Sequence, residues 1–338
     1  MKKVVTFGEL QLRLETQGLL RFCPTNQLQY AFGGSEANTA IGLANFGIPA
    51  SYVTKLPQHD MGRVARSFIQ SFGVETQHIV MGEGRMALYF FEKGNDLRPN
   101  QTISDRRYSN FSLSSPEEYD WDTIFEGSDW FHFTTITPAL GAGLPSACRE
   151  ACAAAKARGM TVSCDLNYRS VLWTAEAART VTESLMPYVD VLIANQEHAK
   201  QVFGFDVPSV ELTDPVPDYS GCQQMAQALA KRYGLQKVVI TLRGTITQRE
   251  NLFGAVLCEN DVCTIQTPYR FRVDERTGAG DAFTAGFLYG CKTGMSGEDA
   301  LHFGAASCAF KHSVPGDVCI ASVSEVAAIR DKHEPNQS

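Results

Sequence analysis

The chain has 338 residues, a formal net charge of −7 and 44% hydrophobic residues. This is the composition of a globular protein that is long enough to bury a substantial core. The acidic balance argues against a nucleic-acid-binding protein, because binding phosphate backbones favours a basic surface, but a local cluster of arginines suffices for a small anionic ligand. No apolar run is long enough for a signal peptide or a membrane span, so we expect a cytoplasmic protein.

The ten cysteines are scattered along the chain, and none of them forms a C-x-x-C pair. In that compartment we expect all of them to be free thiols with structural roles. Cys258 and Cys263 flank a turn that is predicted at Asn260-Asp261.

Short apolar runs alternate with amphipathic segments along the chain. The apolar runs are expected to be strands, at Val4–Phe7, Trp130–Thr134, Thr161–Leu166, Val189–Ala194 and Lys237–Thr241. The amphipathic segments are expected to be helices, at Glu36–Phe46, Gly62–Phe72, Leu144–Arg158, Ala175–Met186 and Gln223–Tyr233, with a mainly helical part from Asp281 to Lys311. Strands buried on both faces and joined by helices predict an α/β fold with a doubly wound, mostly parallel sheet.

Two segments, about residues 10–32 and 84–110, carry β patterns instead. In the second, Met86–Phe91 is followed by a turn signal at Glu92–Asp96. Two such excursions from one domain predict a small separate sheet, which would act as a lid beside the strand ends; a surface hairpin is the alternative. The α/β domain is then expected to span residues 1–330, with 331–338 as a C-terminal tail.

Polar residues follow several of the predicted strands. Ligands of open α/β sheets bind beyond the carboxyl ends of the strands, so these residues predict a binding site at that edge. They are Gly8 and Glu9; Asp165, Asn167 and Arg169; Asn195 and Glu197; and Arg243, Gly244 and Thr245.

A glycine-rich run leads into the predicted C-terminal helices. Gly278 to Gly280 would present backbone N–H groups at a helix N-terminus, where the positive end of the helix dipole suits a phosphate. Asp281 at the same point is placed to accept a proton from a hydroxyl that attacks a phosphorus atom. The alternative is that Asp281 only caps the helix. Neither a P-loop nor a dinucleotide fingerprint occurs in the chain.

The chain resembles the ribokinase-like (PfkB) family of carbohydrate kinases over almost its whole length. The resemblance rests on an early signature, Gly33-Gly34-Ser35-Glu36-Ala37-Asn38, and a late one, Gly278-Ala279-Gly280-Asp281. Longer segments are most similar to 2-keto-3-deoxygluconate kinases, among them Trp130-Phe131-His132-Phe133, Asp165-Leu166-Asn167-Tyr168-Arg169 and the run from Lys311 to Asp317.

This resemblance implies an enzyme that uses ATP and Mg²⁺ to phosphorylate the 6-hydroxyl of 2-keto-3-deoxygluconate. It implies Asp281 as the catalytic base and Gly278, Ala279 and Gly280 as the anion hole. The implied substrate-binding residues are Gly33, Gly34, Asn38, Tyr89, Arg106, Arg169 and Asp317. The implied ATP-binding residues are Asn167, Asn195, Arg243, Gly244, Gly278 and Gly280, with Glu197 as the candidate metal ligand.

The chain departs from the family pattern at Glu275-Arg276, at His198 and at Ser104. Arg13 lies near the start of the first β segment, where a surface position is at least as plausible as a role in the site.

Two rival functions remain open. The first is another ribokinase-like enzyme such as a fructokinase, and the second is a non-catalytic sugar-acid sensor or binding subunit. Arg106 and Arg169 favour an anionic sugar, and an intact Asp281 favours catalysis. We expect no nucleic-acid or membrane partner, but we do expect a homo-oligomer formed through the unpaired edges and apolar face of the lid.

Overall fold

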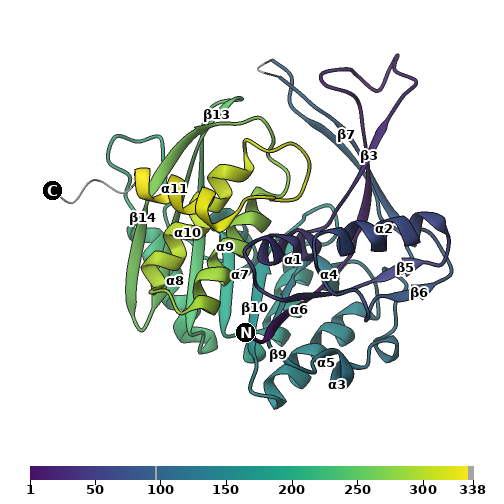
Figure 1. Cartoon of the computed structure of the whole chain (residues 1–338). Coiled ribbons are helices and arrows are strands. Elements are labelled where there is room, and N and C mark those ends of the chain that lie inside the picture. The colour runs from purple at the N-terminus through teal and green to yellow at the C-terminus, as the bar shows by residue number, and fades with distance from the viewer. Residues whose placement is uncertain (96, 334–338) are drawn as a thin grey trace.

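The computed structural model describes residues 1–95 and 97–333, and its largest element is an eight-stranded sheet (Figure 1). The strand order is β14-β13-β12-β11-β10-β9-β1-β4. The strands are β1 (Lys3–Phe7), β4 (Ala50–Val53), β9 (Ser128–Thr134), β10 (Thr161–Leu166), β11 (Val191–Asn195), β12 (Lys237–Thr247), β13 (Glu250–Glu259) and β14 (Val262–Arg272). Neighbours from β4 to β12 are parallel, and β13 pairs antiparallel with both β12 and β14, which confirms the predicted, mostly parallel sheet.

Helices cover both faces of this sheet and form a separate hydrophobic core on each. On one face lie α3 (Trp121–Ile124), α5 (Leu144–Ala157), α6 (Ala175–Leu185), α7 (Gln196–Phe203) and α8 (Ser220–Tyr233). On the other lie α1 (Ser35–Asn45), α2 (Asp60–Ser71), α9 (Ala279–Thr293), α10 (Gly297–Lys311) and α11 (Val323–His333). The predicted doubly wound arrangement is therefore confirmed. No described helix combines the length and hydrophobicity that crossing a bilayer requires.

The sequence patterns did not predict the short strand β4 or the half-exposed strand β14. β4 has only four residues, too few to show a period. β14 is an edge strand whose buried and exposed residues alternate irregularly. A turn of helix α4 (Ile136–Ala139) follows β9, two 3₁₀ turns lie at Pro116–Glu118 and Met186–Tyr188, and a two-stranded pair joins β5 (Lys55–Pro57) to β6 (Val80–Gly82).

The two β excursions form a second sheet of four strands, which we call the small sheet. Its order is β3-β2-β7-β8, from β2 (Gln11–Glu15), β3 (Gln29–Gly33), β7 (Ala87–Glu92) and β8 (Gln101–Asp105). The central pair, β2 and β7, is parallel, and the two outer pairs are antiparallel. Figure 1 shows these strands projecting away from the α/β body. The prediction of a separate sheet is confirmed, and the alternative of a surface hairpin is wrong.

The predicted turn at Glu92–Asp96 and the predicted C-terminal tail both include residues outside the described ranges. After β7, Asn95 and Arg98 exchange backbone hydrogen bonds, which places a turn where one was predicted, but Asp96 itself lies outside the described residues. The C-terminal tail was predicted to begin at residue 331. Helix α11 continues to His333, and residues 334–338 lie outside the description.

The expectation that all cysteines are free is wrong for one pair, because Cys258 and Cys263 form a disulfide. The predicted turn between them explains the pairing. Asn260 and Asp261 both adopt positive φ, at 51° and 63°, as in the tight turns that suit hairpins. Because the turn has two residues, Cys258 on β13 lies directly opposite Cys263 on β14, and their Cα atoms are 4.1 Å apart.

Candidate active site

A cavity of about 460 Å³ lies between the small sheet and the carboxyl ends of the parallel strands. Twelve of the predicted site residues line it, although they come from distant parts of the chain. These are Gly34, Asn38, Tyr89, Arg106, Asn167, Arg169, Asn195, Arg243, Gly278, Gly280, Asp281 and Asp317.

The other predicted residues lie behind or outside the cavity wall. A Cβ on Gly33 would lie 1.8 Å from Oδ2 of Asp317, so this glycine makes room for that carboxylate. Ala279 is buried as the first residue of α9, and Gly244 packs against leucine side chains. Glu197, the candidate metal ligand, accepts a 2.8 Å hydrogen bond from Ser209 and does not line the cavity.

Asp281 lies inside the first turn of α9. The N-cap is Gly278, and Asp281 is the third residue of the helix, so the alternative that Asp281 caps the helix is wrong. Its Oδ2 accepts a hydrogen bond of 2.7 Å from Nδ2 of Asn38 on α1. Burial raises the pKa of Asp281 to about 6, while the Asn38 hydrogen bond and the charge of Arg169 oppose the rise. A carboxylate with a pKa near neutrality suits proton transfer.

The turn before α9 requires glycine at one position. Gly278 has φ of 77°, in the left-handed region, and a Cβ on it would lie 1.8 Å from the backbone oxygen of Asp317. The loop that carries Asp317 therefore packs directly on the helix start. The first N–H groups of a helix have no acceptor within the helix, and Gly278 and Gly280 line the cavity, so this helix start can offer donors there.

Two arginines, Arg169 and Arg106, and a second carboxylate, Asp165, line the same cavity as Asp281. Burial lowers the pKa of Arg169, but a guanidinium group keeps its proton in proteins, so the side chain stays cationic. Burial and the nearby Asp281 raise the pKa of Asp165 to about 7. Arg106, from the loop after β8, donates from Nε to Glu9 at 2.7 Å, and Glu9 is only 2% exposed.

His198, a departure from the family pattern, also lines the cavity. Its pKa is lowered to about 4, first by burial and then by Arg169 and Arg243, so the ring is neutral at pH 7. The sequence reasoning left out other lining residues. Ser35 lies within the early signature, and Arg276 and Thr277 directly precede the glycine-rich run, so these three could have been predicted. Asn100 and Thr102 carried no local signal.

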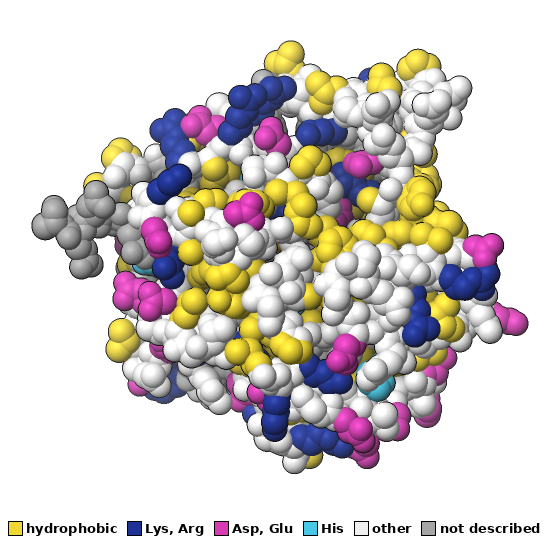
Figure 2. All heavy atoms as spheres, viewed as in Figure 1, with side chains coloured by type: hydrophobic (Ala, Val, Ile, Leu, Met, Phe, Trp, Pro, Cys, Tyr) yellow, Lys and Arg dark blue, Asp and Glu magenta, His cyan; other side chains and the backbone are white. Residues whose placement is uncertain are grey.

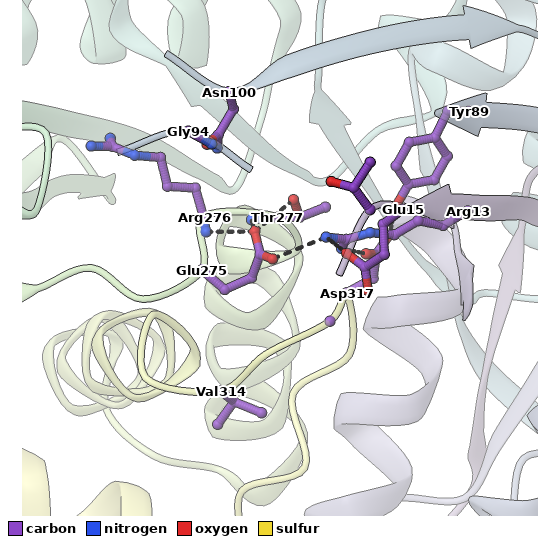
Figure 3. Close-up of polar contacts among 12 residues, drawn as sticks. Arg13, Glu15, Tyr89, Gly94, Asn100, Glu275, Arg276, Thr277, Val314 and Asp317 are labelled. Atoms are coloured by element: carbon purple, nitrogen blue, oxygen red, sulfur yellow. Dashed lines mark hydrogen bonds and ion pairs between the residues drawn. The ribbon is translucent and has the colours of Figure 1, made fainter. Parts of the chain in front are cut away.

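The surface position considered for Arg13 is wrong, because its side chain is completely buried. Figure 3 shows Arg13 between Glu275 and Asp317, with the Tyr89 hydroxyl pointing at Asp317. The Tyr89 hydroxyl donates to Asp317 at 2.5 Å, and the Arg13 guanidinium lies 4.3 Å from the centre of the Phe91 ring. Ion pairs with carboxylates and contacts with aromatic rings therefore compensate the Arg13 guanidinium for the loss of its hydration.

Comparisons with known proteins agree on one family. A sequence profile of the pfkB family carbohydrate kinases matches residues 1–320. A Haloferax volcanii protein named 2-dehydro-3-deoxygalactonokinase is 32% identical over 327 residues, covering 97% of this chain and 96% of that protein. A Bacillus subtilis 2-dehydro-3-deoxygluconokinase is 26% identical and covers 93% of this chain and 90% of its own. The crystal structure of 2-dehydro-3-deoxygluconokinase from Thermotoga maritima superposes with a TM-score of 0.93 at 38% identity, covering 98% of both chains.

Proposed function

Because the chain belongs to the pfkB family of carbohydrate kinases, we propose that it transfers the γ-phosphoryl group of ATP to the 6-hydroxyl of 2-keto-3-deoxygluconate. One observation carries the proposal: the buried Asp281 lies at the start of α9 in the same cavity as Arg106 and Arg169. A base, an anion-binding helix start and two cations in one cavity meet the needs of phosphoryl transfer to an anionic sugar.

In the proposed reaction, Asp281 takes the proton of the 6-hydroxyl as that oxygen attacks the γ-phosphorus. A new P–O bond forms, the bond from the γ-phosphorus to the β–γ bridging oxygen breaks, and ADP leaves with that electron pair. The 2.7 Å hydrogen bond from Asn38 orients the carboxylate. N–H groups from Gly278 to Gly280 face the charge that develops on the transferring group.

We assign the sugar acid to the small-sheet side of the cavity. Arg169, with Arg106 beside it, would hold the substrate carboxylate and the migrating phosphate, because a planar guanidinium matches two oxygens at once. The Asp317 carboxylate and the Tyr89 oxygen would accept hydrogen bonds from the distal hydroxyls, because the Tyr89 hydroxyl already donates its hydrogen to Asp317. The backbone at Gly33 and Gly34 would lie against the sugar.

ATP would occupy the other side, beside Arg243 and Gly244, with Asn167 and Asn195 near its phosphates. The chain offers few direct ligands for Mg²⁺: among the described residues, no group of three or more His, Cys, Asp or Glu side chains is placed to hold a metal ion. This fits Mg²⁺, which usually keeps several waters and binds through one or two carboxylates and the substrate phosphates. Asp165 lines the cavity and would supply a carboxylate, rather than Glu197, which lies outside it. The ion would neutralise phosphate charge.

We propose that the small sheet closes over the sugar as a lid and joins two copies of the chain. Its outer face carries an apolar row across all four strands, formed by Tyr30, Leu14, Phe90 and Ile103. Tyr30 is 58% exposed and Ile103 is 48% exposed. Figure 2 shows hydrophobic side chains gathered on this sheet above α2. A second copy would cover the row, and Phe90→Asp should shift the sedimentation coefficient to that of a single chain.

We propose a cytoplasmic location, where ATP is available. Eight cysteines are free thiols, as is usual in a reducing compartment. We propose no nucleic-acid or membrane partner, in keeping with the net charge of −7.

An assay of ADP release with a panel of sugars tests the function. The panel holds 2-keto-3-deoxygluconate, its 2-keto-3-deoxygalactonate epimer and fructose, because the relatives are named for both acids. We expect kcat/KM to be highest for the gluconate-derived acid. A preference for fructose favours a fructokinase, and sugar-acid binding by calorimetry without ADP release favours a non-catalytic binding subunit.

A further inference from the structure

Arg13 connects the small sheet to the turn that precedes α9. Its side chain starts on β2, is 0% exposed, and forms ion pairs with three carboxylates. The N–O distances are 2.5 Å to Glu15, 3.1 Å to Glu275 and 2.5 Å to Asp317. Burying a guanidinium is costly unless its partners are well placed, so this cluster is a built feature of the fold.

Glu275 connects Arg13 to the turn that precedes α9, which is the proposed anion hole. Its Oε2 accepts from Arg13, while its Oε1 accepts from the backbone N–H of Arg276 at 2.9 Å and of Thr277 at 3.0 Å. The Thr277 hydroxyl donates to the same Oε1 at 2.9 Å. Thr277 directly precedes Gly278, so one carboxylate holds the backbone that shapes the helix start, and Arg13 holds that carboxylate.

Asp317 gives Arg13 a second connection to the same place. Its Oδ1 accepts from Arg13 and its Oδ2 from the Tyr89 hydroxyl, both at 2.5 Å. Its backbone oxygen packs on Gly278. Two strands of the small sheet, β2 and β7, therefore meet the helix start through a single carboxylate.

We propose that Arg13 is a positioning residue that ties the small sheet to the Glu275–Gly278 turn and to Asp317, so that closure over the sugar and the shape of the anion hole are set together. Arg13 does not line the cavity and acts only through its partners. The proposal rests on the phosphotransfer function above, which assigns the helix start to the transferring phosphoryl group.

Because Arg13 is the counter-charge of buried carboxylates, its removal should change the pH dependence of kcat/KM. Burial raises the pKa of Asp317, and Arg13 and the Tyr89 hydroxyl oppose the rise. The other charged groups near it are Glu275 before α9, Lys311 on α10 and Asp281 on α9. Without Arg13, Asp317 and Glu275 become two buried carboxylates with one fewer counter-charge, and the pair takes up a proton at higher pH.

The test compares Arg13→Met, Arg13→Lys and the control Arg98→Met. Arg98 lies between β7 and β8 and pairs with a buried carboxylate, Glu92. Its other hydrogen bonds go to the carbonyls of Leu19 and Lys93 and not to the turn before α9. We expect Arg13→Met to lower kcat about 10- to 100-fold, with a smaller change in KM for ATP, and to move the acid limb of kcat/KM for the sugar upward by about one pH unit or more. Arg13→Lys should fall between, because a point charge satisfies fewer partners. Arg98→Met should leave the acid limb in place.

Hydrogen exchange supplies a readout that does not depend on turnover. In Arg13→Met, exchange should quicken both in β2 and in the backbone from Glu275 to Gly280, whereas in Arg98→Met it should quicken in the small sheet alone. If Arg13→Met does not fold, Arg13→Lys is read in the same way. Faster exchange in β2 only, or an unmoved acid limb in a folded variant, overturns the proposal. A wild type that releases no ADP with any sugar overturns the phosphotransfer function instead, and the exchange result still decides whether Arg13 couples the two parts.

Discussion

Replacing Asn38 by alanine removes the 2.7 Å hydrogen bond from Nδ2 to the Asp281 carboxylate. A hydrogen bond to a charged group contributes about 1.5–3 kcal/mol net, and one pKa unit corresponds to about 1.36 kcal/mol. Because the bond favours the ionised carboxylate, its loss should raise the pKa of Asp281 by about one to two pH units.

The change in pKa converts directly into a change in rate. Burial already raises the pKa of Asp281 to about 6, so its carboxylate, the proposed base, is mostly ionised at pH 7 in the wild type. In Asn38→Ala the acid limb of kcat/KM should move to between about pH 7 and 8, so activity is lost earlier as the pH falls. The rate at pH 7 should fall about two- to tenfold from this cause and recover above about pH 9.

The assay is ADP release with the sugar acid from pH 5 to 10, with Asn195→Ala as the matched control. Asn195 lies in the same cavity, but its Nδ2 donates to the carbonyl of Thr241 at 3.4 Å and not to Asp281 or to a partner of Asp281. Its loss should leave the acid limb where it is. If Asn38→Ala lowers the rate by the same factor at every pH, Asn38 only binds the sugar, and the link between this hydrogen bond and the base is refuted.

Three further predictions address the base, the sugar carboxylate and the loop behind the site. Asp281→Asn should lower kcat about 100-fold or more, as expected for loss of a positioned base, with ATP binding retained in calorimetry; near wild-type turnover in a folded variant removes Asp281 from catalysis. Arg169→Lys should lower kcat/KM about ten- to a hundredfold more for the sugar acid than for fructose, because fructose lacks the carboxylate and loses only the contact to the migrating phosphate; an equal loss for both sugars contradicts a carboxylate contact. Lys311→Met should cost about 3–5 kcal/mol in the free energy of unfolding by urea, since the buried ammonium loses hydrogen bonds to the carbonyls of Val314 at 2.9 Å and Gly316 at 2.7 Å; an unchanged midpoint and slope would show that the two carbonyls find other partners.

Local patterns in the sequence determined the main elements of this protein. β10 was predicted with the bounds Thr161–Leu166 that the structure has, because its apolar residues Val162, Cys164 and Leu166 recur at every second position, which is the period of a strand. The start of α9 was also predictable from local sequence, because a run of glycines followed by an acidic residue and a helical pattern indicates a helix start within a few residues. The separate sheet followed from β alternation that interrupted the α/β rhythm.

The surroundings of single charged side chains were decided by tertiary structure. Arg13 sits in a short strand that reads as half-exposed, yet its partners Glu275 and Asp317 are 262 and 304 residues away in the chain. Glu197 follows a strand end, as a ligand-binding residue should, but the direction of its side chain takes it to Ser209 instead. Local propensity reports the backbone around a residue, whereas burial and ion pairing depend on which distant segments pack against it. For that reason the sequence by itself determined the fold class and the glycine-rich turn before α9, and only the packed chain decided which charges face the cavity.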